Sequence, residues 1–229
     1  MSHSSEQKLL KTVENELLAN PQTLLLERES GLRAMLANDS LIDLSRLFRL
    51  YSRVHGGLEA IAEMFRLHVV RMGHDKIELR VARLNAFSES AGKPQDKDKE
   101  SQAVASDDPQ FIKDFIAVHD KYLCMVREQF SSHALFQKAL NDAFHQLVNQ
   151  DPNTSTQEDE NQDKEAPAAK EKTADLIATF CDRLLKSGSV EKLDDTEIEN
   201  HLEKTAQLFS YLIDKDVFAE IYKNQLAKR

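Results

Sequence analysis

The sequence predicts an all-α protein, and three observations support this prediction. The 229 residues include only 6 Gly and 5 Pro, with 41 % apolar and 30 % charged residues, a composition within the range of soluble globular proteins. Apolar residues recur at spacings of three and four through most of the chain, which is the period of an amphipathic helix. No segment shows a convincing alternation of apolar and polar residues, the pattern of a half-buried strand.

Helices are expected first over 6–19 and 22–37, where Leu, Val and Met form helical stripes. Gly31 is a weak point of the second helix, because glycine is a poor helix former. The third helix follows Ser40 and Asp43, which have the spacing of a capping box. Its apolar residues continue at spacings of three and four until a pair of glycines ends it.

The next helices are expected over 58–72, closed by Gly73, and around 77–84. The segment 88–110 then has one Val, no aromatic residue and many charges, the composition of a mobile insertion. Two strongly apolar helices follow over 111–130 and 135–148. The first of them has the widest apolar face in the chain and is expected at the centre of a helical bundle. The aromatic residues of both helices are expected in the core: Phe115, Tyr122, Phe130, Phe136 and Phe144.

A second polar tract covers 150–172 and is predicted to be a disordered linker. Thr173 can cap the helix that follows it, Thr196 and Glu199 have the spacing of a second capping box, and Asp216 can cap the last helix. Three short helices cannot cover one another's apolar stripes well. More chain or another subunit is therefore expected to pack on Val217, Phe218, Ile221 and Tyr222.

Histidines and cysteines give no pattern of a metal site or a nucleophile. His68 and His74 are six residues apart, and His119 and His133 lie on or beside helices, with no further ligand spaced to complete a tetrahedral site. Solvated or half-buried histidines are the expected outcome. Cys124 and Cys181 are expected to be small buried apolar residues.

Paired carboxylates also give no sign of catalysis. Glu27 with Glu29, and Asp194 with Asp195, lie on polar faces or at helix starts, where carboxylates are expected in any case. No phosphate-binding loop, nucleophile elbow, zincin or kinase pattern occurs. We therefore predict no catalytic, cofactor-binding or metal-binding residues, and a function in recognition or scaffolding.

One basic cluster stands out on the third predicted helix. Arg46, Arg49 and Arg53 recur at spacings of three and four, so they line one side of that helix. Such a row is expected to be the solvated face of an amphipathic helix, and the alternative is a surface for an acidic partner.

Charge and hydropathy exclude several other classes of function. The formal net charge is −9, which argues against a general nucleic-acid binder because phosphate contacts need a basic surface. No apolar run approaches the ~20 residues of a membrane span, and the polar N-terminus lacks the apolar block of a signal peptide. Cytoplasm and nucleus are therefore the expected locations.

Three segments, taken in order, resemble the cullin family. The first, "LANDSLIDLSRLFRLYSRVHGGLEAIAEMFRLHV" at 36–69, is similar to the third helical repeat of cullins, with its pattern DL.R...L..R...GL......F..H. The matching positions are Asp43, Leu44, Arg46, Leu50, Arg53, Gly57, Leu58, Phe65 and His68.

The second segment, 108–149, resembles the family block F...L...H.KY..LV...F.....F..AL..AF..F.N. It matches at Phe111, His119, Lys121, Tyr122, Val126, Phe130, Phe136, Ala139, Leu140, Ala143, Phe144 and Asn149. The third, 202–229, resembles the run L.....LF.Y...KDVF...Y...LAKRL that opens the C-terminal half of cullins. It matches at Leu202, Leu208, Phe209, Tyr211, Lys215, Asp216, Val217, Phe218, Tyr222, Leu226, Ala227, Lys228 and Arg229.

This resemblance implies a division of the chain. Residues 1–20 correspond to the end of the second cullin repeat, and 21–149 to the third repeat with the polar insertion 88–110. A linker over 150–172 then leads to 173–229, the beginning of the C-terminal four-helix bundle. The implied fold is a cullin-repeat helical bundle followed by the first helices of a second bundle.

The resemblance also implies a function. The chain is expected to be a non-catalytic scaffold segment of a cullin-RING ubiquitin ligase, a rigid arm that positions the substrate receptor relative to the ubiquitin-conjugating enzyme. Its expected partners are ligase subunits and cullin regulators, with no cofactor, nucleic acid or membrane. The segments "SRLFRLYSRVHGGLE" and "LIATFCDRLLKSGS" look most like the class that assembles with F-box adaptors.

Some parts of a cullin are not expected in this chain. The family's adaptor-binding surface lies in the first repeat, and its RING-box-binding domain and modified lysine lie beyond the third matched segment. Two alternatives therefore stay open. One is a truncated cullin-like regulator that occupies cullin partners without ligase activity, and the other is an unrelated helical tethering protein.

Overall fold

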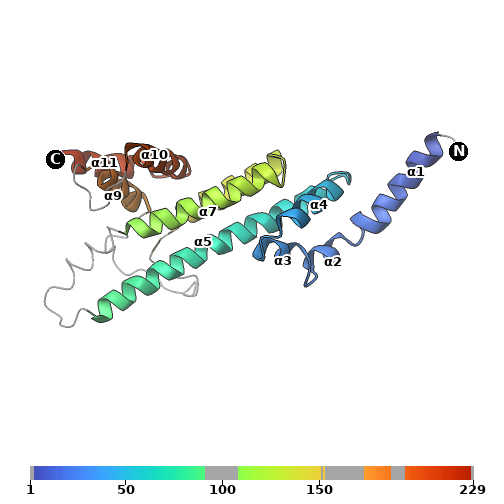
Figure 1. Ribbon diagram of the computed structural model, residues 1–229, viewed down its shortest axis with the longest axis horizontal. Helices are drawn as coiled ribbons and strands as arrows, with labels where there is room; N and C mark the ends of the chain where they lie inside the picture. The colour runs from blue at the N-terminus through green and yellow to red at the C-terminus, as the bar shows by residue number, and fades with distance from the viewer. Residues whose placement is uncertain (1–2, 91–107, 151, 153–172, 187–193, 228–229) are drawn as a thin grey trace. The chain divides into compact units, whose positions relative to one another are not determined.

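The computed structural model describes residues 3–90, 108–150, 152, 173–186 and 194–227 (Figure 1). Every regular element in these ranges is a helix, which confirms the all-α prediction. The chain forms two compact units, one of Met1–Val69 with Asp120–Ala143 and one of Val70–His119 with Phe144–Arg229. Among the helices described, none combines the length and apolarity needed to cross a membrane.

The helices follow one another in a simple order. They are α1 (His3–Glu14), the π-helical turn η1 (Asn15–Ala19), α2 (Gln22–Glu27), α3 (Leu32–Ala37), α4 (Leu41–Tyr51), α5 (Gly57–Ser90), α7 (Pro109–Glu128), α8 (Ala134–Val148), α9 (Thr173–Leu185), α10 (Asp195–Ser210) and α11 (Lys215–Ala227). Three of them, α5, α7 and α8, contribute residues to both units. The predicted helices over 111–130 and 135–148 are confirmed as α7 and α8.

The single helix predicted over 22–37 is wrong, because the chain breaks into α2 and α3 at Gly31. The amide of Gly31 donates to the carbonyl of Arg28 at 2.7 Å. A Cβ at residue 31 would lie 2.8 Å from that carbonyl oxygen and would overlap the carbonyl oxygen of Leu26. The chain therefore turns tightly against its own backbone there, and only glycine fits this position.

The start of α4 is predicted correctly, but its capping contact is not. Ser40 occupies the N-cap position and its side chain makes no capping hydrogen bond. Asp43 instead accepts a hydrogen bond from Arg46 at 3.0 Å, one turn further along the helix. The opposite charge of Arg46 competes for the carboxylate, since side chains three apart on a helix are neighbours.

The capping box predicted from Thr196 and Glu199 is displaced by two residues. Asp194 is the N-cap of α10, and Glu197 completes a reciprocal capping box with it. The hydroxyl of Thr196 donates to the Asp194 carboxylate at 2.9 Å. A carboxylate therefore caps the helix in place of the predicted hydroxyl. Its negative charge also interacts favourably with the positive end of the helix dipole. Thr173 and Asp216 lie within the first turns of α9 and α11.

The expectation that Gly73 closes a helix is also wrong. Helix α5 runs without interruption from Gly57 to Ser90, 34 residues in all. Gly73 is buried, and a Cβ there would overlap the side chain of Leu147 on α8. The missing side chain thus lets α8 approach α5 closely, and the packing offsets the low helix propensity of glycine.

The first unit is built around a cluster of aromatic rings. Phe130 and Phe136 stack with their centroids 4.0 Å apart, and Phe65 meets Phe130 edge-on at 5.5 Å. Phe48 on α4 lies 5.9 Å from both stacked rings. All five aromatic residues predicted for the core, here and in the second unit, are buried: Phe115, Tyr122, Phe130, Phe136 and Phe144.

In the second unit, α9 packs against both α10 and α11 (Figure 1). Most of the residues of α9 are buried, whereas no residue of α11 is fully buried. Phe218 stacks on Tyr222 with centroids 5.7 Å apart and lies 4.7 Å from Phe209. The predicted stripe of Val217, Phe218, Ile221 and Tyr222 is half-buried, so α9 and α10 cover it only in part.

The two polar tracts fall mostly outside the described residues. The tract predicted over 88–110 is shorter than expected, because α5 extends to Ser90 and α7 begins at Pro109. Of the tract over 150–172, the structure describes Gln150 and Pro152. The two compact units are defined by packing, and each combines segments that are far apart in the sequence. They therefore do not test the predicted division into consecutive repeats and a linker, which stays a prediction.

The close contact at Gly73 gives the first testable prediction. Alanine at an open helical position is more stable than glycine by about 1 kcal/mol. Gly73→Ala should instead destabilise the protein by about 1–3 kcal/mol, because the new methyl group overpacks against Leu147. Urea unfolding followed by far-UV circular dichroism measures this change.

The double variant Gly73→Ala/Leu147→Ala is the control for this contact. Leu147→Ala alone should cost about 2–5 kcal/mol by leaving a cavity. The double variant should cost less than the sum of the two single changes, since the new methyl group then occupies vacated space. Stabilisation by Gly73→Ala alone would contradict the close approach.

Candidate functional site

Two buried histidines each face a tyrosine hydroxyl. Nε2 of His68 lies 2.9 Å from the hydroxyl of Tyr122 in the first unit. Nε2 of His119 lies 3.2 Å from the hydroxyl of Tyr211 in the second unit, where burial raises the pKa of Tyr211. The expectation of solvated or half-buried histidines is therefore wrong for both, because their rings fill aromatic cores and their nitrogens find hydroxyl partners.

The remaining candidate ligands do not assemble into a site. His74 and His133 are half-buried, as expected. No group of three or more His, Cys, Asp and Glu side chains placed to hold a metal ion occurs in the described part of the chain. The carboxylates singled out in the sequence are all exposed: Glu27, Glu29, Asp194 and Asp195. Asp194 serves as the N-cap of α10.

The cysteines differ from the expectation of two buried residues. Cys124 is exposed on α7, and a hydrogen bond with Glu128 raises its pKa. Cys181 on α9 is partly buried, and burial raises the pKa of its thiol to about 11. Both shifts disfavour the thiolate at neutral pH, so neither side chain has the character of a nucleophile.

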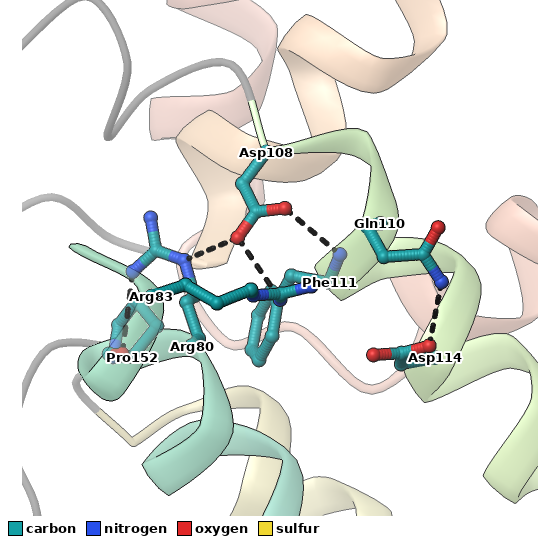
Figure 2. A network of polar contacts seen from close by, with 7 residues as sticks. All are labelled: Arg80, Arg83, Asp108, Gln110, Phe111, Asp114 and Pro152. Carbon is teal, nitrogen blue, oxygen red and sulfur yellow. Dashed lines mark hydrogen bonds and ion pairs between the residues drawn. The ribbon is translucent and has the colours of Figure 1, made fainter. Parts of the chain in front are cut away.

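The most developed polar network of the second unit centres on Arg80 (Figure 2). Arg80 lies on α5 and its side chain is 0 % exposed. Its Nε lies 3.5 Å from Oδ2 of Asp108, and its Nη1 donates to the carbonyl of Pro152 at 3.2 Å. Its guanidinium carbon also lies 5.2 Å from the centroid of the Phe111 ring, within the range of a cation–π contact.

Asp108 joins this arginine to the start of α7. One carboxylate oxygen accepts from the amide of Phe111 at 3.2 Å, the third residue of the helix, which is the geometry of an N-cap. The other oxygen pairs with Arg83 at 3.2 Å as well as with Arg80. Figure 2 shows both arginines converging on this carboxylate, so the network holds Asp108, the residue that caps α7, to α5.

The Arg80 network therefore fixes the ends of both polar tracts. Asp108 lies near the end of the first tract, and Pro152 lies near the start of the second. We call Arg80, Arg83, Asp108 and the Pro152 carbonyl the arginine anchor. Its role is mechanical, because its contacts hold Asp108 and Pro152 to the arginines of α5.

A second anchor lies at the end of α8. The side-chain nitrogen of Asn149 donates to the carbonyls of His145, at 2.6 Å, and Tyr211, at 2.9 Å. Its side-chain oxygen accepts from the amide of Ile213 at 2.9 Å. The two ends of one amide group thus bind the turn between α10 and α11, while the Tyr211 ring packs 5.9 Å from Phe144.

The roles of the anchor residues were not predicted from the sequence, although Arg80 and Asp108 have local signals. Arg80 falls three residues after Ile77 and four before Leu84, so it lies on the predicted apolar stripe of its helix. Asp108 precedes Pro109, the preferred order of cap and first helical residue. The role of Asn149 has no local signal, because its partners lie 62 and 64 residues away.

Arg46 and Arg49 lie on α4, but Arg53 lies in the turn after it, because α4 ends at Tyr51 and does not continue to the predicted glycine pair. Arg46, Arg49 and Arg53 are all exposed, whereas Leu44 and Phe48 on α4 are buried. Arg46 and Arg49 are therefore on the outward side of α4, as predicted for an amphipathic helix.

The arginine anchor gives a second testable prediction. Arg80→Met keeps most of the side-chain volume but removes the charge that faces Asp108 and Pro152. The free energy of unfolding should fall by about 2–4 kcal/mol, because a buried charge network loses its central partner. Arg83→Met is the matched control, since Arg83 is partly exposed and should cost under about 1 kcal/mol. Urea titrations compare the two, and equal stabilities would contradict the anchor.

Asn149 gives a third prediction. Asn149→Ala removes three hydrogen bonds and should lower stability by about 1–3 kcal/mol. Hydrogen exchange should show faster exchange of the Ile213 amide, which loses its acceptor. Asn20→Ala is the control, because Asn20 is exposed and its side chain bonds only to Glu16, at 3.2 Å, among the described contacts. Unchanged protection of Ile213 in Asn149→Ala would count against this role.

Comparisons with known proteins cover the whole chain. A family model described as the cullin alpha solenoid domain matches residues 1–229. Cullin-1 of Oryza sativa subsp. japonica is 39 % identical over 227 residues, which are 99 % of this chain and 27 % of that protein. Cullin-2 of Arabidopsis thaliana is 34 % identical, with the same two coverages.

A more distant relative fits the same pattern. Cullin-3A of Arabidopsis thaliana is 29 % identical over 98 % of this chain and 25 % of its own length. The chain thus spans about a quarter of the length of these relatives. Since the domain match covers all 229 residues and agrees with the all-helical fold, the chain belongs to the cullin family.

Proposed function

We propose that this chain is a non-catalytic scaffold segment of a cullin-RING ubiquitin ligase. It acts as part of an arm that positions a substrate receptor relative to a ubiquitin-conjugating enzyme in ubiquitin-dependent protein degradation. The observation that carries the proposal is the match of the cullin alpha solenoid domain to residues 1–229.

The packing of each unit supports a mechanical role. In the first unit, the stacked pair Phe130 and Phe136 is enclosed by Phe48 and Phe65 at centroid distances under 6 Å. Aromatic interiors of this density resist deformation, because each ring has little free volume into which to move. In the second unit, Asn149 and the arginine anchor hold connecting segments to helices by polar contacts.

A stiff arm contributes to ubiquitin transfer without touching the reacting atoms. Holding a target lysine near a thioester raises the effective concentration of the amine, and this gain is largest when the span is fixed. The proposal therefore assigns no catalytic residue, cofactor or metal ion to this chain.

Partners, subtype and location belong to the same proposal. The partners are ubiquitin-ligase subunits and cullin regulators, and the class is the one that works with F-box adaptors, on the resemblance of 45–59 and 176–189. The division into the end of the second repeat, the third repeat and the start of the C-terminal bundle is proposed with boundaries at 20, 149 and 172. The proposed location is cytoplasm and nucleus.

A chimera tests this function. The matched segment of rice Cullin-1 is replaced by residues 1–229 of this chain, and the chimera is purified with its adaptor and RING-box partner. It should support ubiquitin transfer to a receptor-bound substrate. A chimera that folds and captures both partners but transfers no ubiquitin would contradict the proposed positioning role.

A core variant of the chimera separates positioning from assembly. Phe130→Leu removes the stacked ring and should lower the transfer rate while both partners are still captured, because the loosened core permits more positions of the arm. Lys138→Ala, an exposed change on α8, should leave the rate unchanged. Equal rates for both variants would show that core stiffness does not set the rate.

A further inference from the structure

The outward side of α4 combines positive charge with exposed apolar surface. Ile42, Arg46 and Arg49 follow one another at spacings of four and three, so they fall in one line along α4, and Arg53 follows in the turn after the helix. Leu50 lies beside this line, four residues after Arg46. These five residues, all exposed, are called the α4 arginine face.

The described contacts of Arg46 and Arg49 contribute little to the stability of the fold. Arg46 is 73 % exposed and, among the described residues, pairs only with Asp43, itself 52 % exposed, at 3.0 Å. Arg49 donates to the hydroxyl of Ser45 at a long 3.4 Å. An ion pair between two exposed side chains contributes under about 1 kcal/mol, so a carboxylate from outside can replace Asp43 at small cost.

The α4 arginine face is positively charged, whereas the chain as a whole is negatively charged, so the face favours negatively charged partners. The whole chain carries a formal charge of −9, yet this face has three arginines, and Asp43 is the one carboxylate on α4 itself. Ile42 is 70 % exposed and Leu50 41 % exposed, and neither side chain contributes to the core. A partner that covers the face therefore meets cations in a row with aliphatic contacts beside them.

We propose that the α4 arginine face binds an acidic helical segment of a protein partner, with carboxylates at spacings of three and four and one apolar residue. Arginine forks bind carboxylates in a bidentate manner, and this favours Arg over Lys at such a surface. Helix α4 has 11 residues, a length of about 16 Å, which matches three turns of a partner helix.

A protein partner fits the face better than a nucleic acid does. Three cations release few counterions from a phosphate backbone, and the remaining charge of this chain repels such a polyanion. The exposed side chains of Ile42 and Leu50 gain from contact with an apolar residue, which a phosphate backbone does not offer. This inference stands on the α4 surface alone and is independent of the proposed ligase function.

Fluorescence anisotropy with the full 229-residue chain tests the proposal. The probe is a labelled alanine-based helical peptide with Glu at positions i, i+4, i+7 and i+11 and one Leu between them. It should bind at 50 mM NaCl and weaken at 300 mM, while the same peptide with Gln for Glu should not bind. Arg46→Glu/Arg49→Glu/Arg53→Glu should weaken binding about tenfold or more.

The matched control reverses three other exposed cations. Arg71→Glu/Arg127→Glu/Lys138→Glu makes the same change in net charge on α5, α7 and α8 and should leave the affinity nearly unchanged. Ile42→Ser should weaken binding without any change in charge. Circular dichroism confirms that each variant keeps its helices, which is expected because all the altered residues are exposed.

Four binding results would overturn the proposal. They are no binding of the Glu peptide, an equal loss in both charge-reversal variants, stronger binding of a single-stranded oligonucleotide of equal charge, and no effect of Ile42→Ser. Self-association of the chain that is lost with the α4 triple variant would assign the face to a second copy, and would also overturn it.

Discussion

The close approach of α8 to α5 at Gly73 is the constraint on which the second unit depends. Because residue 73 has no side chain, Leu147 can occupy the space where a Cβ would otherwise lie. Two residues further along, Asn149 is then placed at the end of α8, where its amide holds the backbone at Tyr211 and Ile213. The close packing at Gly73 and the polar contacts of Asn149 therefore lie at the same end of α8, where the turn between α10 and α11 is held.

Polar contacts complete what apolar packing leaves unspecified. An apolar core fixes which faces of the helices meet, but it does not fix the path of a connection, whose backbone groups need hydrogen-bonding partners. In the second unit those partners come from long side chains, with Arg80 reaching Pro152 and Asn149 reaching Ile213. Burial of Arg80 is tolerated because the carboxylate of Asp108 balances its charge and the carbonyl of Pro152 accepts a hydrogen bond from its Nη1.

The same physics explains which features could be predicted from the sequence. Periodicity identified the helices and the buried aromatic residues, because burial follows from residue type and spacing alone. It failed at Gly31 and Gly73, where glycine has opposite effects: close backbone contacts turn the chain at Gly31, and a neighbouring helix packs over Gly73. Only the three-dimensional surroundings distinguish the two. The capping contacts shifted for a related reason, since nearby Arg46 and Asp194 competed with the predicted partners.

Arginine itself shows how position determines role in this protein. Arg80 lies on the apolar stripe of α5, so folding removes it from water and its charge must be satisfied internally. Arg46 and Arg49 lie opposite the buried residues Leu44, Phe48 and Tyr51 of α4, and Arg53 is exposed in the turn after this helix. Folding leaves their charges in solvent, where removing them would change stability little. The buried arginine is therefore committed to the fold, and the exposed row is available for recognition without loss of structure.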